Sequence, residues 1–174
     1  MADPWLQQLY EWRNFHLLLG AVAATLTGLM FVVVSLGPHL IAAHTATGVR
    51  AFVTPTVVYF TTVLVVAAFM TIPTVTAPIL AALLALTSLG GLGYMGSTGA
   101  HSLCRHDNLD RLDWLCYVGL PILSYLLILG AAVGIWMRTT PGLDGVAGAV
   151  LLLLVIGIRN AWDLVLWFAQ QRHA

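Results

Sequence analysis

The chain has 174 residues, of which 60% are hydrophobic and 8% are charged, and its mean hydropathy is +0.92. An average soluble domain is roughly 25% charged and about 45–50% apolar, so this composition excludes an ordinary water-soluble domain. Seven basic and seven acidic residues give a net charge of zero, which gives no support to a nucleic-acid partner. The length allows a single transmembrane domain, residues 1–174, of about five spans at roughly 20 residues each.

The chain begins with a predicted short interfacial helix. Asp3 and Pro4 form a helix-start signal, and Trp5 and Trp12 are typical of a membrane–water interface. The apolar stretch at about residues 15–36 is too long for the core of a cleaved signal sequence, so we interpret it as a retained first span. Small residues recur at every fourth position of this span, on a face that another helix can approach closely: Gly20, Ala24 and Gly28.

Two further spans follow in quick succession. Thr54 and Pro55 are the expected cap and first-turn proline of a second span, at about residues 54–72. The short segment PTVTAP connects it to a third span at about residues 77–99, which ends in LGGLGYMGSTG. A glycine-rich loop binds phosphate where a strand precedes it. No strand pattern is present, so we interpret these glycines as close helix packing or a flexible helix end.

The fourth span, at about residues 112–137, has two features that bear on helix geometry. Pro121 removes a helical hydrogen-bond donor and predicts a bend. Gly130 and Gly134 have the GxxxG spacing of packed membrane helices. The turn after this span ends at Asp144, which we expect to cap the fifth span.

The fifth span, at about residues 145–168, contains three polar residues within IGIRNAWDLVLW. Arg159 and Asp163 are four positions apart, so they lie one above the other on a helix, and Asn160 adjoins them. With Trp167 as the interfacial marker, Arg159 lies about 12 Å inside the membrane. A charge at the bilayer centre costs about 2.5–3.5 kcal/mol on insertion scales and is normally paired or directed to the bundle interior.

Three hypotheses account for this cluster. In the first, Arg159 and Asp163 form an intrahelical ion pair that fixes how the fifth span packs. In the second, the cluster is the polar lining of a path for an ion, a proton or an anionic solute. In the third, it contacts lipid headgroups or another subunit. Asp113, further into the fourth span, is able to face Arg159 and is counted with this cluster.

The histidines form a second candidate site. His39 with His44 and His101 with His106 offer four imidazole donors, the ligands that haem and transition metals take. Both pairs are five residues apart, whereas ligands on one helix face recur at three or four, so histidines in wet loops are the plainer interpretation. No cofactor is therefore predicted, and haem or a transition metal is the alternative.

The loop charges predict an orientation. Five spans place the two termini on opposite sides of the membrane. The C-terminal side carries four arginines and the other side two, which by the positive-inside rule predicts the N-terminus outside and the C-terminus in the cytoplasm. These are Arg50, Arg105, Arg111 and Arg172 against Arg13 and Arg138. Cys104 and Cys116 are too few for a disulfide framework, and their redox state stays open.

The segments GAVAATLTGLMFVVVSL and GIRNAWDLVLW resemble those of small bacterial integral membrane proteins of about five spans, which have no established activity. The resemblance implies a bacterial inner-membrane (plasma-membrane) protein. It assigns no catalytic or binding residue.

Together these patterns predict an all-α polytopic membrane protein, a bundle of about five transmembrane helices with a short N-terminal interfacial helix. So small a bundle in a lipid bilayer is expected to associate with copies of itself or with partner membrane subunits. We expect a homo-oligomeric channel- or transporter-like protein for an ion or small solute, or a membrane assembly subunit. The alternative is a metal- or haem-dependent redox protein or enzyme with its site at the cytoplasmic end. Whether any reaction is catalysed stays open.

Overall fold

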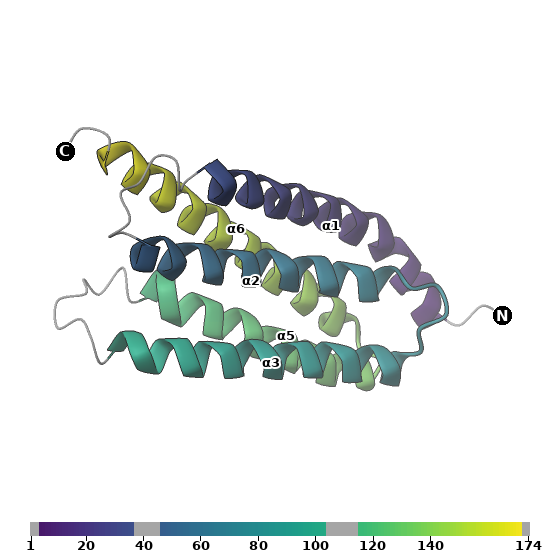
Figure 1. Ribbon diagram of the computed structural model, residues 1–174. Coiled ribbons are helices and arrows are strands. Elements are labelled where there is room, and N and C mark those ends of the chain that lie inside the picture. The colour runs from purple at the N-terminus through teal and green to yellow at the C-terminus, as the bar shows by residue number, and fades with distance from the viewer. Residues whose placement is uncertain (1–3, 37–45, 104–114, 172–174) are drawn as a thin grey trace.

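The computed structural model describes residues 4–36, 46–103 and 115–171, which are helical apart from two short turns. Figure 1 shows these helices lying side by side with their long axes roughly aligned. Five of the helices in the described ranges are long and apolar enough to cross a membrane. The predicted fold class, an all-α polytopic bundle, is thereby confirmed. The elements are α1 (Pro4–Leu36), α2 (Ala46–Thr71), α3 (Ala77–Leu103), the π-helical turn η3 (Leu115–Gly119), α5 (Leu120–Trp136) and α6 (Thr140–Gln171).

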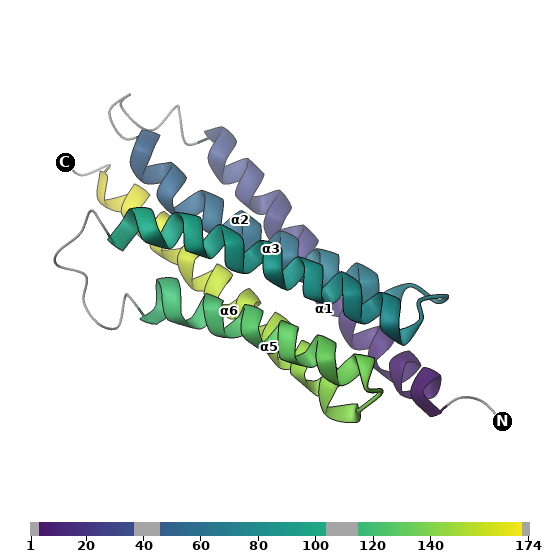
Figure 2. The ribbon, with the colours of Figure 1, turned by 90° about the horizontal axis from the view of Figure 1, so that it is seen from below.

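Helix α6 occupies the middle of the bundle. It packs against both α5 and α2, whereas α1 packs mainly on α2, and α3 packs mainly on α5. Figure 1 shows α1 and α3 at opposite edges, with α6 passing diagonally between them, and Figure 2 shows α5 alongside α6. Burial follows the same order, since 56% of the most apolar stretch of α6 is buried against only 17% of that of α1. The polar cluster predicted on the fifth span is therefore on the most buried of the five candidate spans.

The predicted interfacial segment is continuous with the first span, because Pro4–Leu36 form one helix. No proline or glycine separates Trp12 from the apolar stretch, so nothing in the sequence ends the helix there. A helix of 33 residues is about 50 Å long, which exceeds the ~30 Å hydrocarbon core of a bilayer. Its inward side has residues at alternating spacings of four and three: Trp5, Leu9, Trp12, His16, Leu19, Ala23, Leu26 and Met30.

Two helix starts differ from the prediction. Helix α2 begins at Ala46 and continues through Pro55, so the expectation that Thr54 caps it is wrong. Helix α6 begins at Thr140, which places Pro141 in its first turn, where the missing N–H breaks no helical bond. Asp144 consequently lies one turn inside α6, and its predicted role as N-cap is also wrong.

The regular helix is interrupted where Pro121 predicted a bend. The π-helical turn Leu115–Gly119 stands directly before Leu120–Trp136, and Pro121 falls in the first turn of α5. A π-turn is a rare insertion that is enriched at functional sites. In this chain it carries Tyr117, which contributes to the polar cluster described below.

Glycines bring α5 and α6 into backbone contact. A Cβ added at Gly134 would lie 3.0 Å from the Cα of Gly142, and one added at Gly142 would lie 2.8 Å from the amide nitrogen of Ile135. Only a residue without a side chain permits this approach. Gly134, predicted as a packing residue, thus lies at a contact within the bundle.

The remaining small residues of the predicted packing faces divide between inside and outside. A Cβ at Gly20 would lie 3.1 Å from the Cβ of Ala67 on α2, whereas nothing lies within 4 Å of such an atom at Gly28 or Gly130. Ala24 is exposed as well. Ala24, Gly28 and Gly130 therefore face outward, and their role as contacts between copies of the chain stays a prediction.

Candidate functional site

The three polar residues of α6 form a stripe from the bundle interior to its outer surface. Asn160 is buried, with 2% of its surface exposed. The side chains of Asp163 and Arg159 are 31% and 47% exposed, and Nε of Arg159 lies 4.0 Å from Oδ2 of Asp163. At that separation the two charges attract each other without a close hydrogen bond between these atoms. The structure thus brings together the i, i+4 pair expected from the spacing.

A tyrosine on a neighbouring element completes the cluster. The hydroxyl of Tyr117 donates a hydrogen bond of 2.6 Å to Oδ2 of Asp163. This short bond joins the π-helical turn η3 to α6, and a bond to an ionised carboxylate is stronger than one between neutral groups. Sequence analysis did not identify Tyr117 as a site residue. Two features of the sequence could have indicated it. Tyr117 lies in an apolar span close to Pro121, and Asp163 provides a carboxylate deep in another span.

Asn160 lies near a close contact between α6 and α2. One turn before it, a Cβ added at Gly157 would lie 2.5 Å from Cε1 of Phe60. The Oδ1 atom of Asn160 is buried there and has no hydrogen-bond partner among the described residues. A buried carbonyl without a donor costs about 1–3 kcal/mol. Asn160 is therefore unfavourable for the stability of the single bundle unless another group donates to it.

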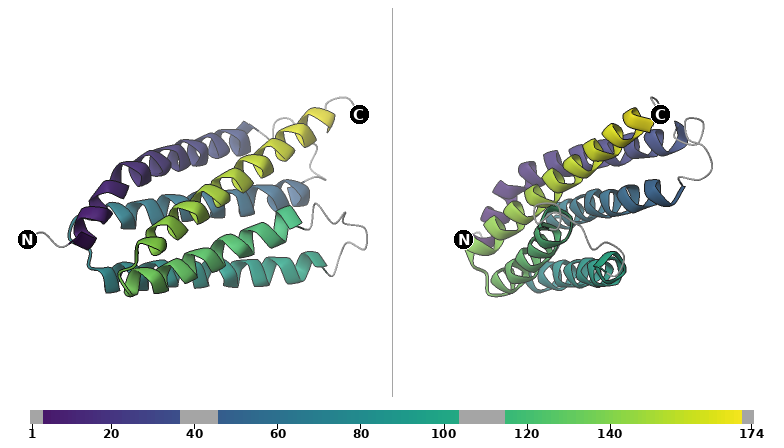
Figure 3. Two further views of the ribbon diagram at one scale, coloured as in Figure 1. Left: turned by 180° about the vertical axis from the view of Figure 1, so that it is seen from behind. Right: turned by 90° about the vertical axis from the view of Figure 1, so that its left-hand side faces the viewer.

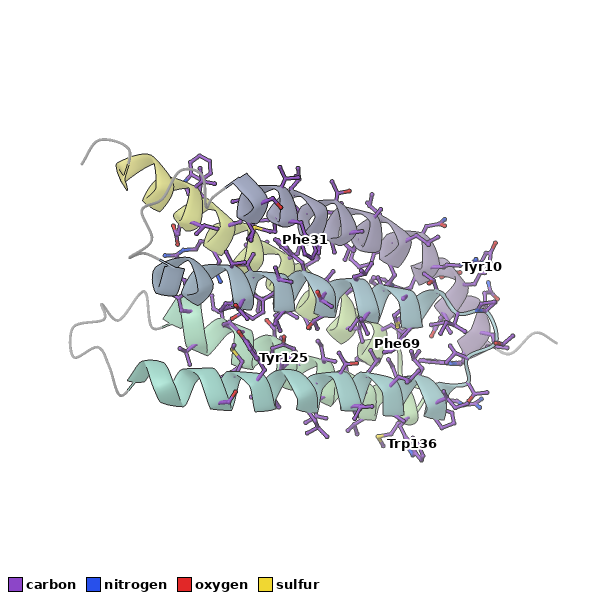
Figure 4. All side chains as sticks on the ribbon, viewed as in Figure 1. Tyr10, Phe31, Phe69, Tyr125 and Trp136 are labelled. Carbon is purple, nitrogen blue, oxygen red and sulfur yellow. The ribbon has the colours of Figure 1, made fainter. Side chains whose placement is uncertain are left out.

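A second polar cluster lies between α2, α3 and α5. The Thr62 hydroxyl donates to the carbonyl of Val58 at 2.9 Å, which leaves its oxygen to accept the hydroxyl of Tyr125 at 3.1 Å. Ser88 donates a 2.6 Å bond to the backbone carbonyl of Tyr125. Figure 4 shows Tyr125 directed into the bundle. The cluster joins three helices with its hydroxyl groups paired.

One bond of this second cluster is local and the other is not. Hydroxyls in apolar helices commonly bond to a carbonyl of their own helix, and Thr62 does so with Val58. Its additional bond to Tyr125 joins residues 63 positions apart, and no local pattern indicates such a pairing. Nearby, the Tyr59 hydroxyl points at the Met95 sulfur at 3.6 Å, a weak contact that links α2 to α3.

One histidine is buried in the described ranges. His16 has no exposed surface, and its Nδ1 lies 3.0 Å from the carbonyl of Trp12. Because a carbonyl only accepts, Nδ1 carries the proton and Nε2 the lone pair. Nε2 is buried and has no hydrogen-bond partner within the described residues.

The predicted metal ligands and one predicted member of the polar cluster fall outside the described part of the chain. These are His39, His44 and His106, the side chain of His101, and Asp113, which was expected to face Arg159. In residues 4–36, 46–103 and 115–171, no group of three or more His, Cys, Asp or Glu side chains could hold a metal ion. The metal or haem site stays a prediction.

The fold and the cluster together define a class: a polytopic, all-α membrane protein with a charged and hydrogen-bonded group inside its central helix. Comparison with protein-family models, with curated proteins and with solved structures finds no match.

Proposed function

We propose that this membrane protein is a homo-oligomeric channel- or transporter-like protein for an ion or small solute, whose path is lined by Arg159, Asn160 and Asp163. The observation that carries the proposal is the partial exposure of a charged pair inside an apolar span. Arg159 and Asp163 are 47% and 31% exposed, although both lie within the span Thr140–Leu166. Charged side chains at such depth face a bundle interior or a water-filled cavity, since hydrocarbon solvates them poorly.

The surface on which the cluster is exposed supports assembly from several copies of the chain. The exposed residues around Arg159 are apolar, among them Val155, Ile158 and Trp162, so this side of one bundle is otherwise suited to lipid or to another helix. A neighbouring copy would enclose the pair and turn an open stripe into a lined path. The outward small residues Gly28 and Gly130, which have open space beside them, support such close helix contacts.

Flux measurements test the path. In proteoliposomes, Asp163→Asn and Arg159→Gln are each expected to lower the flux of the permeant ion roughly tenfold or more, which corresponds to about 1.4 kcal/mol on a barrier. Asp144→Asn is the matched control, because it makes the same chemical change on an exposed residue near the start of α6. Equal flux in all three variants would contradict the proposal.

The oligomeric state separates transport from an assembly role. Sedimentation of the purified protein in detergent is expected to show a stable oligomer, and Arg159→Gln is expected to leave it intact while flux falls. If the wild-type protein carries no ion and Arg159→Gln dissociates the oligomer, the cluster serves assembly, and the protein is a membrane assembly subunit instead.

We further propose a bacterial inner membrane, with the N-terminus outside and the C-terminus in the cytoplasm. Helix α1 begins at one end of the bundle and α6 ends at the other, as Figure 3 shows, and the arginine distribution supports this direction. A fluorescent protein that matures only in the cytoplasm is expected to fluoresce when fused to the C-terminus. Fluorescence from the N-terminal fusion alone would reverse the orientation.

A further inference from the structure

Asn160 and Asp163 face the same junction between neighbouring elements. A helix advances by about 100° per residue, so residues three apart differ by about 60° around its axis. On α6, Gly157 faces Phe60 of α2, and Asp163 faces Tyr117 of η3. Asn160 is three residues from each, so its direction lies between these two. The side chain of Asn160 therefore points into the junction between α2 and η3, beside the carboxylate of Asp163.

Each of these side chains has an oxygen that can accept a ligand. Oδ1 of Asn160 is buried and has no hydrogen-bond partner among the described residues, and the residue as a whole is 2% exposed. The contacts of Asp163 with Tyr117 and Arg159 both engage Oδ2, which leaves Oδ1 of the same carboxylate to accept a further partner. A buried carbonyl without a donor is unfavourable, and a ligand that binds it removes that cost.

The junction is accessible from the side of the carboxylate. The side chain of Asp163 is 31% exposed, whereas Asn160 is buried. Along α6, Asn160 lies about 4.5 Å further from the C-terminal end of the helix than Asp163. A ligand that enters from that end therefore meets the carboxylate first and the buried carbonyl second.

The charges of the junction favour a ligand with a single positive charge. Carboxylate and carbonyl oxygens are ligands of hard cations, and the affinity for divalent cations depends on how many of the ligands are charged. Here one carboxylate is present, and Nε of the oppositely charged Arg159 lies 4.0 Å from its Oδ2. This arrangement disfavours a divalent cation. It also weakens the binding of a monovalent one, which suits an ion that must leave its site again.

We propose that Asn160 and Asp163 bind a monovalent metal cation, Na⁺ or K⁺, through their Oδ1 atoms, with water in the remaining positions. The hydrogen bond from Tyr117 to Oδ2 holds the carboxylate in place. Carbonyl oxygens inside membrane proteins coordinate such ions in channels and transporters. This inference rests on the proposed function, because it names the class of ion that the path along α6 carries.

Cation titration of the purified full-length protein in detergent tests the site without a measurement of transport. NaCl and KCl are added separately, and N-methyl-D-glucamine chloride keeps the ionic strength constant. The midpoint of thermal unfolding gives an apparent affinity for each cation, because a ligand that binds the folded protein stabilises it. At least one of the two cations is expected to raise the midpoint in a saturable manner. MgCl₂ at the same ionic strength is expected to bind less tightly.

Two variants each change one ligand. Asn160→Leu removes the carbonyl and Asp163→Asn removes the charge, and each is expected to weaken the apparent affinity for the cation about tenfold or more. Asn160→Leu also deletes a buried oxygen that has no partner in the described part of the bundle, so this variant is expected to fold. Asp144→Asn, at an exposed position near the start of α6, is the control and is expected to bind as the wild-type protein does.

Three results would overturn the cation site. The first is a midpoint that responds to Na⁺ and K⁺ no more than to N-methyl-D-glucamine. The second is wild-type cation affinity in Asn160→Leu, which would place the cation elsewhere. The third is tighter binding of Mg²⁺ than of either monovalent cation.

Flux in proteoliposomes separates failure of this inference from failure of the proposed function. If Na⁺ or K⁺ binds and both variants lose it, but neither cation crosses the membrane, the cation site is supported and the path is contradicted. If another solute crosses in a manner that requires Arg159 and Asp163, and no cation binds, the path is supported and the cation site is overturned.

Discussion

The two polar clusters of the bundle differ in burial and in how completely their hydrogen bonds are paired. In the cluster between α2, α3 and α5, Thr62, Ser88 and Tyr125 are buried, and their hydroxyls bond to one another or to carbonyls. In the cluster on α6, Asp163 and Arg159 are partly exposed, and Oδ1 of Asn160 is buried with no partner in the described ranges. The first cluster pairs its hydroxyls within one copy of the chain, whereas in the second the buried Oδ1 of Asn160 has no partner among the described residues.

This difference indicates that the paired cluster stabilises the bundle and that the cluster on α6 has another role. A paired hydroxyl inside an apolar bundle contributes about 0.6 kcal/mol on average and up to about 1.7 kcal/mol. A charge and an unpaired carbonyl at similar depth are unfavourable, and such residues in membrane spans are characteristically functional. The paired cluster therefore serves as an interhelical lock, and the α6 cluster is the candidate site. Removing the polar group of Thr62 and that of Asn160 is therefore expected to have opposite consequences for stability.

The largest effect on stability is expected at Gly91, against which the lock is packed. A Cβ added at Gly91 would overlap the ring of Tyr125, whereas one added at Gly93 would meet nothing within 4 Å. Gly91→Ala is therefore expected to lower the free energy of unfolding by about 1–3 kcal/mol through overpacking. Gly93→Ala, the matched control two residues away, should be close to neutral. Unfolding in detergent measures both, and equal effects would mean that Tyr125 moves freely and is not part of a lock.

The two clusters also differ in how far the sequence could predict them. Arg159 and Asp163 were paired correctly because helical spacing alone places residues four apart together. The bonds of Tyr117 to Asp163 and of Tyr125 to Thr62 join residues 46 and 63 positions apart, and they depend on how two helices rotate against each other. No periodicity within one span contains that information.

The fold shows the same division between local and long-range information. The all-α class followed from long apolar runs, because a membrane admits only structures that pair their own backbone groups. The helix starts at Ala46 and Thr140 were missed because Thr54 and Asp144 are good caps by type. Capping preference is worth about 1 kcal/mol, and neighbouring helices can outweigh it by packing a longer segment.

The second prediction concerns the sign of an effect. Thr62→Val keeps the shape of the side chain and leaves the buried hydroxyl of Tyr125 without its acceptor, so the free energy of unfolding should fall by about 0.6–1.7 kcal/mol. Asn160→Leu removes a carbonyl oxygen that has no donor in the described part of the bundle, so stability should be unchanged or higher. Chemical denaturation of both variants gives the comparison.

Flux through Asn160→Leu completes that comparison. The variant is expected to lose transport in proteoliposomes even though its fold is at least as stable as that of the wild-type protein. If Asn160→Leu is instead destabilised as much as Thr62→Val, Asn160 is a structural residue and the contrast between the two clusters fails.

A smaller loss of stability than that of Thr62→Val is expected from Tyr117→Phe. This change deletes the 2.6 Å bond to Asp163, but water reaches the carboxylate, which is 31% exposed and still lies near Arg159. The loss should stay below about 0.6 kcal/mol, since exposed polar interactions contribute little. Tyr125→Phe deletes the same hydroxyl from a fully buried ring and should cost more. Comparing the two losses in the free energy of unfolding measures how accessible Asp163 is to water. A larger loss for Tyr117→Phe than for Tyr125→Phe would mean that the carboxylate is held in a closed structural contact and is not accessible to a permeant ion.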